Sequence, residues 1–270
     1  MRNSIAIAIF TLREGLKQRI IIGLSLAALI MLTSGVMISG FFMRDISKIV
    51  VDLALSVASA GGLMVPFFVG INMLAGDIEK RTIFTIMAQP VSRWHYVIGK
   101  YIGLSILTLI VILFLASLGL ASIWVGKLMY GPVFFKKFSM KSYLVAVFFN
   151  YWGTNVLLSL VVMWSSITTS SFLSFLLTLA SYLIGNTLDD IVSFVNTNAP
   201  NNPMEETIQT AVIYLQYAVP NLSAFDLKLP VAHGIATSVE EAAVLVSYGA
   251  ACITFILMIS ILTFNRRNIA

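Results

Sequence analysis

YIGLSILTLIVILFLASLGLASIWVG, residues 101–126, contains no Asp, Glu, Lys or Arg. A helix needs about 20 consecutive apolar residues to cross the hydrocarbon core of a bilayer. This stretch is therefore long enough to span a membrane, and five comparable apolar blocks occur elsewhere in the chain. We place these other spans at residues 20–43, 51–75, 143–167, 172–185 and 238–264.

The composition of the 270-residue chain points to the same class. Hydrophobic residues make up 59% of the sequence and charged residues only 11%, whereas a soluble domain carries about 25% charged residues. The mean hydropathy is +0.93. A membrane β-barrel would instead show alternating segments of about ten residues, and we find no such pattern. The sequence thus predicts an all-α, polytopic membrane protein with six transmembrane helices, forming one transmembrane domain over residues 1–270.

The net charge of +5 does not indicate nucleic-acid binding. The Lys and Arg residues lie mostly beside apolar blocks, where they set topology and contact anionic lipid headgroups. The single cysteine, Cys252, excludes an internal disulfide, and no Cys/His cluster has the spacing of metal ligands. We therefore expect membrane lipid, and neither nucleic acid nor a metal ion, as a partner of this chain.

Residues 1–19 show helical amphipathicity. Apolar residues recur at spacings of three or four, and the charged residues fall elsewhere on the helix. The apolar positions are Ile5, Ile9, Leu12, Leu16 and Ile20, and the charged ones include Arg13, Glu14, Lys17 and Arg19. This pattern predicts an interfacial helix with its apolar face toward the bilayer; the alternative is a cytoplasmic extension of the first span.

The distribution of Lys and Arg predicts the orientation. If the N-terminus is cytoplasmic, the inner segments hold ten of the 17 Lys and Arg residues, in keeping with the positive-inside rule. Residues 76–100 then form a cytoplasmic loop, and residues 186–237 form the longest outer segment. The sixth span would begin at a capping box, Ser238 to Glu241, and the C-terminus would return to the cytoplasm.

Residues 75–103, AGDIEKRTIFTIMAQPVSRWHYVIGKYIG, predict a helix–turn–helix element at the inner face. A charged patch leads into a short helix, Pro90 ends that helix, and Ser92 caps the next one. An element that is polar at its tip and apolar behind suits docking into a groove on a soluble partner. The alternative is an ordinary solvated loop between two spans.

The same stretch resembles a known family. EKRT at 79–82, QPVSRW at 89–94 and GKYIG at 99–103 resemble the first cytoplasmic loop of type-2 ABC transporter permeases. The resemblance is greatest to the six-span, stand-alone bacterial branch that includes permeases for nitrous oxide reductase maturation and gliding motility. Weaker similarities follow in the same order along the chain: REGLKQR at 13–19, SSITTSSFLS at 165–174, PNLSAFDL at 220–227 and NRRN at 265–268.

The resemblance implies a function and a set of site residues. In this family the loop carries a coupling helix that docks on a separate ATP-binding cassette ATPase, present in two copies, beneath two permease copies that are identical or related. The resemblance also implies a bacterial inner-membrane location with both termini cytoplasmic. The implied ATPase-coupling residues are Asp77, Glu79, Lys80, Arg81, Thr82, Pro90, Ser92 and Arg93.

The sequence lacks the chemistry of an ATPase. No Walker A pattern occurs in it, so we expect no cofactor and no catalytic residue in this chain, with ATP and Mg²⁺ bound by the partner subunit. The expected function is a permease subunit driven through the 76–92 loop. The pattern does not identify the substrate, and lipid, peptide, drug, ion or a purely mechanical role are all compatible with it.

An ion-gradient-driven secondary transporter is the alternative function. Such proteins usually place ionisable residues inside their spans, and here the spans are nearly free of them. Asn150 and Asn155 are expected to hydrogen-bond between helices, the alternative being contact with substrate. An intramembrane enzyme is disfavoured, because no HExxH, no GxSxG and no paired intramembrane Asp occurs, and His95 and His233 lie in polar segments.

Overall fold

The computed structural model describes residues 2–42, 45–80, 82, 92–136, 138–197, 219–233 and 238–266. Within these ranges the chain is helical and contains no strand, and six helices are long and apolar enough to cross a membrane. The prediction of an all-α, six-span membrane protein is confirmed. The spans are α2 (Arg19–Ser39), α3 with η1 and α4 (Ile46–Glu79), α6 (Arg93–Tyr130), α7 (Met140–Ile167), α8 (Ser171–Thr197) and α11 (Val239–Arg266).

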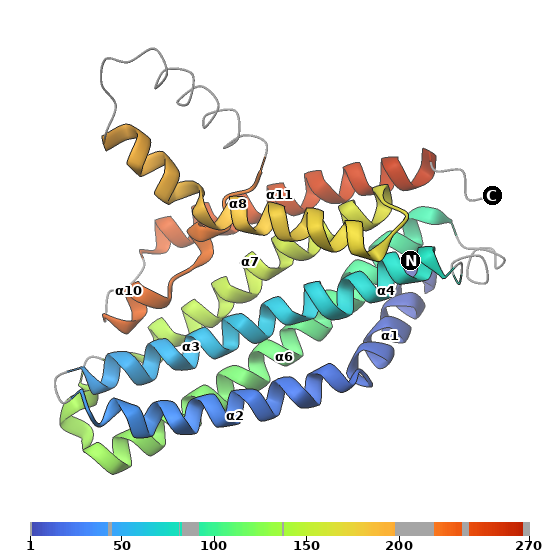
Figure 1. The fold of residues 1–270 in the computed structure, drawn as a ribbon. Coiled ribbons are helices and arrows are strands. Elements are labelled where there is room, and N and C mark those ends of the chain that lie inside the picture. Colours follow the sequence, from blue (N-terminus) through green and yellow to red (C-terminus); the bar gives the residue numbers. More distant parts are fainter. Residues whose placement is uncertain are drawn as a thin grey trace.

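The spans run back and forth between two ends of an elongated bundle (Figure 1). One end, called here the termini end, carries α1 (Arg2–Leu16), the end of α4, the start of α6 and the C-terminal part of α11. The other, called here the opposite end, carries the α2–α3 turn, η2 (Pro132–Phe135) and α10 (Lys228–Ala232). Six spans thus bring both termini to the same end, as predicted.

The buried core lies where α3, α6 and α7 meet. Its fully buried side chains include Leu55, Leu104, Ile112, Leu115 and Leu158. Lipid tails are as apolar as leucine, so packing inside a membrane depends on close contact rather than on removal of apolar surface from water. A Cβ on Gly62 would lie only 2.8 Å from Ile112 Cδ1. This glycine therefore allows α3 and α6 to approach closely.

The second span changes its helix type at Pro66. Residues Val65–Gly70 form one stretch of π-helix, η1, between α3 (Ile46–Met64) and α4 (Ile71–Glu79). A proline has no amide hydrogen and its ring clashes with the preceding turn, so the regular hydrogen-bond ladder cannot continue through it. Pro66 therefore accounts for the change of helix type, and α4 continues from η1 to the termini end.

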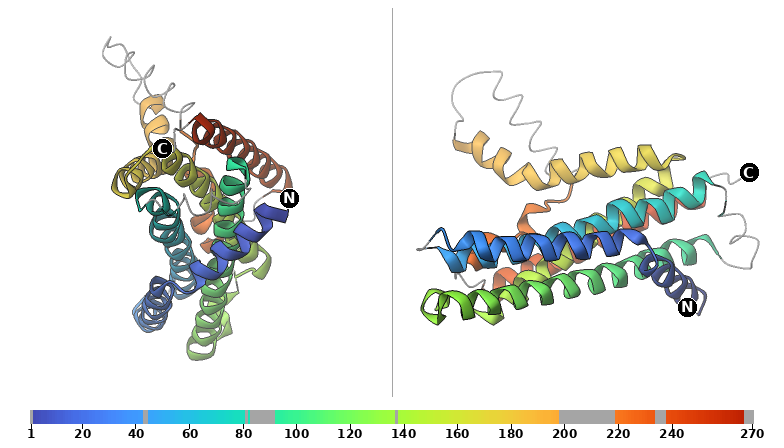
Figure 2. Two further views of the ribbon diagram at one scale, coloured as in Figure 1. Left: turned by 90° about the vertical axis from the view of Figure 1, so that its right-hand side faces the viewer. Right: turned by 60° about the horizontal axis from the view of Figure 1, so that its bottom comes forward.

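Helix α1 packs on the first turns of α6 at an angle to α2 (Figure 2). Its buried face consists of small residues, Ser4, Ala8, Thr11 and Gly15. A Cβ on Gly103 would lie 2.6 Å from the carbonyl oxygen of Ala8, so this contact depends on glycine. The large apolar residues face outward, with Ile5, Ile9, Phe10 and Leu16 all exposed. The predicted apolar stripe exists, and most of it is available to lipid.

Several predicted boundaries are wrong. Helix α8 does not end at Gly185 but continues to Thr197, so the first part of the predicted 186–237 loop is helical. Residues 186–197 contain no proline or glycine to stop it. Helix α6 begins at Arg93, eight residues before its apolar block, and α2 ends at Ser39. Polar residues thus extend α6 and α8 beyond the apolar blocks that the sequence reveals, whereas α2 ends before its block does.

Candidate functional site

The termini end carries the two helix ends that flank the predicted coupling loop. These are the C-terminal end of α4 and the N-terminal end of α6. The predicted site residues in the described ranges are Asp77, Glu79, Lys80, Thr82, Ser92 and Arg93. Arg81, Pro90 and the predicted short coupling helix lie outside the residues that the structure describes.

Asp77 joins the C-terminal end of α4 to α6. The Nζ atom of Lys100 lies 2.8 Å from Asp77 Oδ2 and also donates to the carbonyl oxygen of Met73 at 3.0 Å. The hydroxyl of Tyr96 donates to the same carboxylate oxygen at 3.0 Å, and Thr82 donates to Asp77 Oδ1 at 3.1 Å. The Lys100 side chain is only 1% exposed. A buried ammonium group therefore depends on this carboxylate for its neutralisation.

Glu79 joins the C-terminal end of α4 to α8. Its Oε2 atom accepts a hydrogen bond from the backbone amide of Ser171 at 2.9 Å. Ser171 is the first residue of α8, where unpaired amides and the helix dipole favour a negative charge. The carboxylate thus holds the end of α4 against the turn between the fourth and fifth spans.

Arg93 joins the N-terminal end of α6 to α11. Its Nη1 atom donates to the carbonyl oxygens of Asn265 at 2.9 Å and of Phe264 at 3.3 Å. These carbonyls belong to the last turn of α11, where no further amides of the helix are left to donate hydrogen bonds to them. Ser92 occupies the predicted N-cap position of α6, but its hydroxyl contacts His95 Nδ1 and not a backbone amide.

The loop is therefore tied to α6, α8 and α11 by three of its predicted residues. The sequence assigned Asp77, Glu79 and Arg93 to contact with an ATPase, whereas the structure engages each of them within the chain. Lys80 is exposed and forms no ion pair with any residue in the described ranges.

Sequence reasoning missed Lys100, Tyr96 and Ser171 as partners of the loop. Lys100 offered a usable signal, because a lone cation at the edge of an apolar block needs a nearby anion. At and just after α1, Arg13, Glu14, Lys17 and Arg19 are all exposed.

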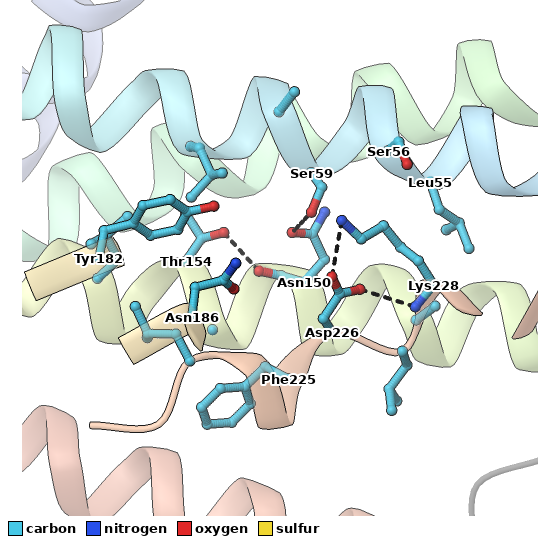
Figure 3. A pocket seen from close by; sticks show the side chains of 17 residues that line it. Leu55, Ser56, Ser59, Asn150, Thr154, Tyr182, Asn186, Phe225, Asp226 and Lys228 are labelled. Atoms are coloured by element: carbon cyan, nitrogen blue, oxygen red, sulfur yellow. Dashed lines mark hydrogen bonds and ion pairs between the residues drawn. The ribbon is translucent and has the colours of Figure 1, made fainter. Parts of the chain in front are cut away.

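A second candidate site is a cavity of about 200 Å³ in the half of the bundle nearer the opposite end (Figure 3). It lies between α3, α7, α8 and residues 222–228. Ser59 of α3 donates to Asn150 Oδ1 of α7 at 3.1 Å across one wall. Asn155 accepts a hydrogen bond from Ser105 of α6 at 2.5 Å. The prediction that both asparagines bond between helices is confirmed, and Asn150 also lines the cavity.

Neither candidate site has the composition of a metal centre. Among the described residues, no group of three or more His, Cys, Asp or Glu side chains is placed to hold an ion. The two histidines of the sequence are also apart: His95 lies in the first turn of α6 and His233 directly after α10.

Comparison with known proteins identifies the family. The family model described as ABC-2 family transporter protein matches residues 5–269. No curated protein matches the chain. The family match includes the N-terminal helix, the predicted coupling loop and all six spans. Because it covers nearly the whole chain, the protein belongs to the ABC-2 family of transporter membrane proteins.

Proposed function

We propose that the chain is the permease subunit of an ABC transporter and that a separate ATP-binding subunit drives it through the 76–92 loop. Membership of the ABC-2 family supports a membrane subunit that works with an ATP-binding partner. The observation that favours this loop as the contact is its attachment to three spans, through Asp77 to α6, Glu79 to α8 and Arg93 to α11.

These attachments suggest how the loop would act. A displaced loop would pull on the first turns of α6 and α8 and on the last turn of α11 together, because each bond joins it to a helix end. ATP binding to the partner can change the balance between permease states only if the partner contacts those states differently. The chain has no Walker A motif, so ATP and Mg²⁺ would be held by the partner.

The proposed assembly contains two ATPase subunits and two permease copies, identical or related, in a bacterial inner membrane. The similarity of the loop motifs at 79–82 and 89–94 to the nitrous oxide reductase maturation branch supports this stoichiometry. Helix α1 would lie in the interface on the cytoplasmic side. Its outward apolar residues Ile5 and Phe10 and its exposed Arg13 and Lys17 suit that position.

We predict that the termini end faces the cytoplasm. In a Cys252→Ser background, a cysteine at exposed Lys136 should react with a membrane-impermeant thiol reagent in intact cells. A cysteine at exposed Thr82 should react only after the cells are permeabilised, because Thr82 lies on the loop at the other end of the bundle. Labelling of Thr82→Cys but not Lys136→Cys in intact cells would reverse the orientation.

We also predict that transport needs ATP and the partner ATPase. The ionisable groups buried in the described spans are few, and the most buried of them, Lys100, is neutralised by Asp77 at the edge of the membrane. A proton- or sodium-coupled carrier usually has such groups deep in its spans. The purified chain in liposomes should therefore show neither ATP hydrolysis nor gradient-driven flux. Robust flux driven by a proton or sodium gradient alone would favour the secondary transporter.

A further inference from the structure

The cavity near the opposite end brings polar groups from four parts of the chain together. Ser56 and Ser59 come from α3, Asn150 and Thr154 from α7, and Tyr182 and Asn186 from α8, while Asp226 and Lys228 come from the segment before and at the start of α10. Figure 3 shows these side chains converging from facing elements. Eight polar or charged side chains thus line one cavity.

Three of these polar groups have unused hydrogen-bonding capacity. The hydroxyls of Ser56 and Tyr182 and the side-chain amide of Asn186 form no hydrogen bond with any residue in the described parts of the chain. Ser56 and Tyr182 are partly buried and Asn186 is exposed, and all three line the cavity. A solute in the cavity can supply these partners.

The cavity is lined by one negative and one positive side chain, which form an ion pair. Asp226 Oδ2 and Lys228 Nζ lie 3.0 Å apart, and their side chains are 42% and 27% exposed. Among the residues that the structure describes, no other charged side chain lines the cavity. Ion pairs with this degree of exposure are weak and open readily. A ligand can therefore replace the pair if it supplies one positive and one negative group at once.

We propose that the cavity is a binding site for a small zwitterion, whose ammonium group pairs with Asp226 and whose anionic group pairs with Lys228. A ligand with a single charge can pair with only one of the two side chains, whereas a zwitterion can form a charge-assisted hydrogen bond with each of them. The volume of about 200 Å³ is below the range of about 300–1,000 Å³ typical of drug-sized ligands. A free amino acid and the headgroup of a zwitterionic lipid both have the required chemistry and size.

That this zwitterion is the transported substrate rests on the permease function proposed above. Its binding does not, because the cavity is built entirely from this chain and lies in the half of the bundle away from the 76–92 loop. A binding measurement without ATPase therefore tests the site separately from the coupling.

The test uses the full chain in nanodiscs of phosphatidylglycerol, which contain no zwitterionic lipid. Equilibrium binding is measured with radiolabelled alanine, as the free solute, and with glycerophosphoethanolamine, as the lipid headgroup. At least one should bind saturably and about tenfold or more tightly than lactate and ethanolamine, which each carry only one charge. Which zwitterion binds more tightly identifies the source of the ligand.

Variants decide whether binding occurs in this cavity. Asp226→Asn and Lys228→Gln should each weaken binding about ten- to hundredfold, through loss of a charged hydrogen bond. Tyr182→Phe, which leaves the charges in place, should weaken it about two- to tenfold. Lys48→Gln is the matched control, because Lys48 forms an exposed pair with Asp45 at the same end of the bundle, and it should leave binding unchanged.

Three outcomes would overturn the proposal. They are the absence of saturable binding for both zwitterions, binding of lactate or ethanolamine as tight as that of the zwitterions, and zwitterion binding that Asp226→Asn, Lys228→Gln and Tyr182→Phe leave unchanged. Because Tyr182→Phe removes only one hydroxyl, it remains informative if a charge variant fails to fold.

Discussion

Replacing Asp77 by asparagine should lower the free energy of unfolding by roughly 3–5 kcal/mol, the range found when one member of a buried ion pair is removed. The Lys100 side chain is 1% exposed, so its charge cannot turn to water when Asp77 is neutralised. Asparagine keeps an oxygen that can accept the hydrogen bond from Tyr96. The decrease in the free energy of unfolding is therefore due to the lost charge and not to a change in side-chain shape.

Replacing Lys100 should lower the free energy of unfolding by less than replacing Asp77 does. In Lys100→Met the charge that remains is Asp77, whose side chain is 20% exposed and which still accepts hydrogen bonds from Tyr96 and Thr82. The double variant Asp77→Asn/Lys100→Met should recover much of the stability, because replacing a whole buried pair by neutral groups is often nearly neutral. The measurement is denaturant unfolding of each purified variant in micelles.

The control is Lys48→Met, which breaks an exposed pair with Asp45 and should cost less than about 1 kcal/mol. Equal effects of Lys48→Met and Lys100→Met, together with a double variant as unstable as Asp77→Asn, would contradict the assignment of a buried pair. Restored stability in the double variant with weak ATPase coupling would separate the structural role of the pair from its transmitting role.

Local signals in the sequence predicted the spans well. The apolar blocks located all six, and Ser238 with Glu241 marked the start of the sixth. The structure confirms that capping box, with Ser238 N donating to Glu241 Oε2 at 3.1 Å and Glu241 N donating to Ser238 Oγ at 3.2 Å. Such features are decided by residues a few positions apart, so the sequence alone reveals them.

Contacts between distant segments could not be predicted in this way. The large apolar residues of α1 predicted a face toward the bilayer, but they did not reveal the small-residue face that packs on α6 against Gly99 and Gly103. The bond from Arg93 to Asn265 joins positions that are 172 residues apart. The resemblance assigned roles to the charged residues of the loop, but their partners within the chain depend on how the spans pack.

Charge reversal at Lys80 tests the central claim, that an ATP-binding subunit docks on this loop. Changes at Asp77, Glu79 or Arg93 would also break bonds within the chain. Lys80 is exposed on the same loop and has no ion-pair partner in the described structure. If it pairs across an interface, reversal should weaken docking about thirtyfold or more, as found for desolvated charge pairs between proteins.

The measurement is recovery of the azido-ATP-labelled subunit with affinity-tagged Lys80→Glu, Lys136→Glu and unchanged chains at matched expression. Lys136 is also exposed but lies at the opposite end of the bundle, after η2. Docking on the loop predicts strong recovery with the unchanged chain and with Lys136→Glu, and little with Lys80→Glu. Equal recovery with both variants, or no labelled subunit with the unchanged chain, would contradict it.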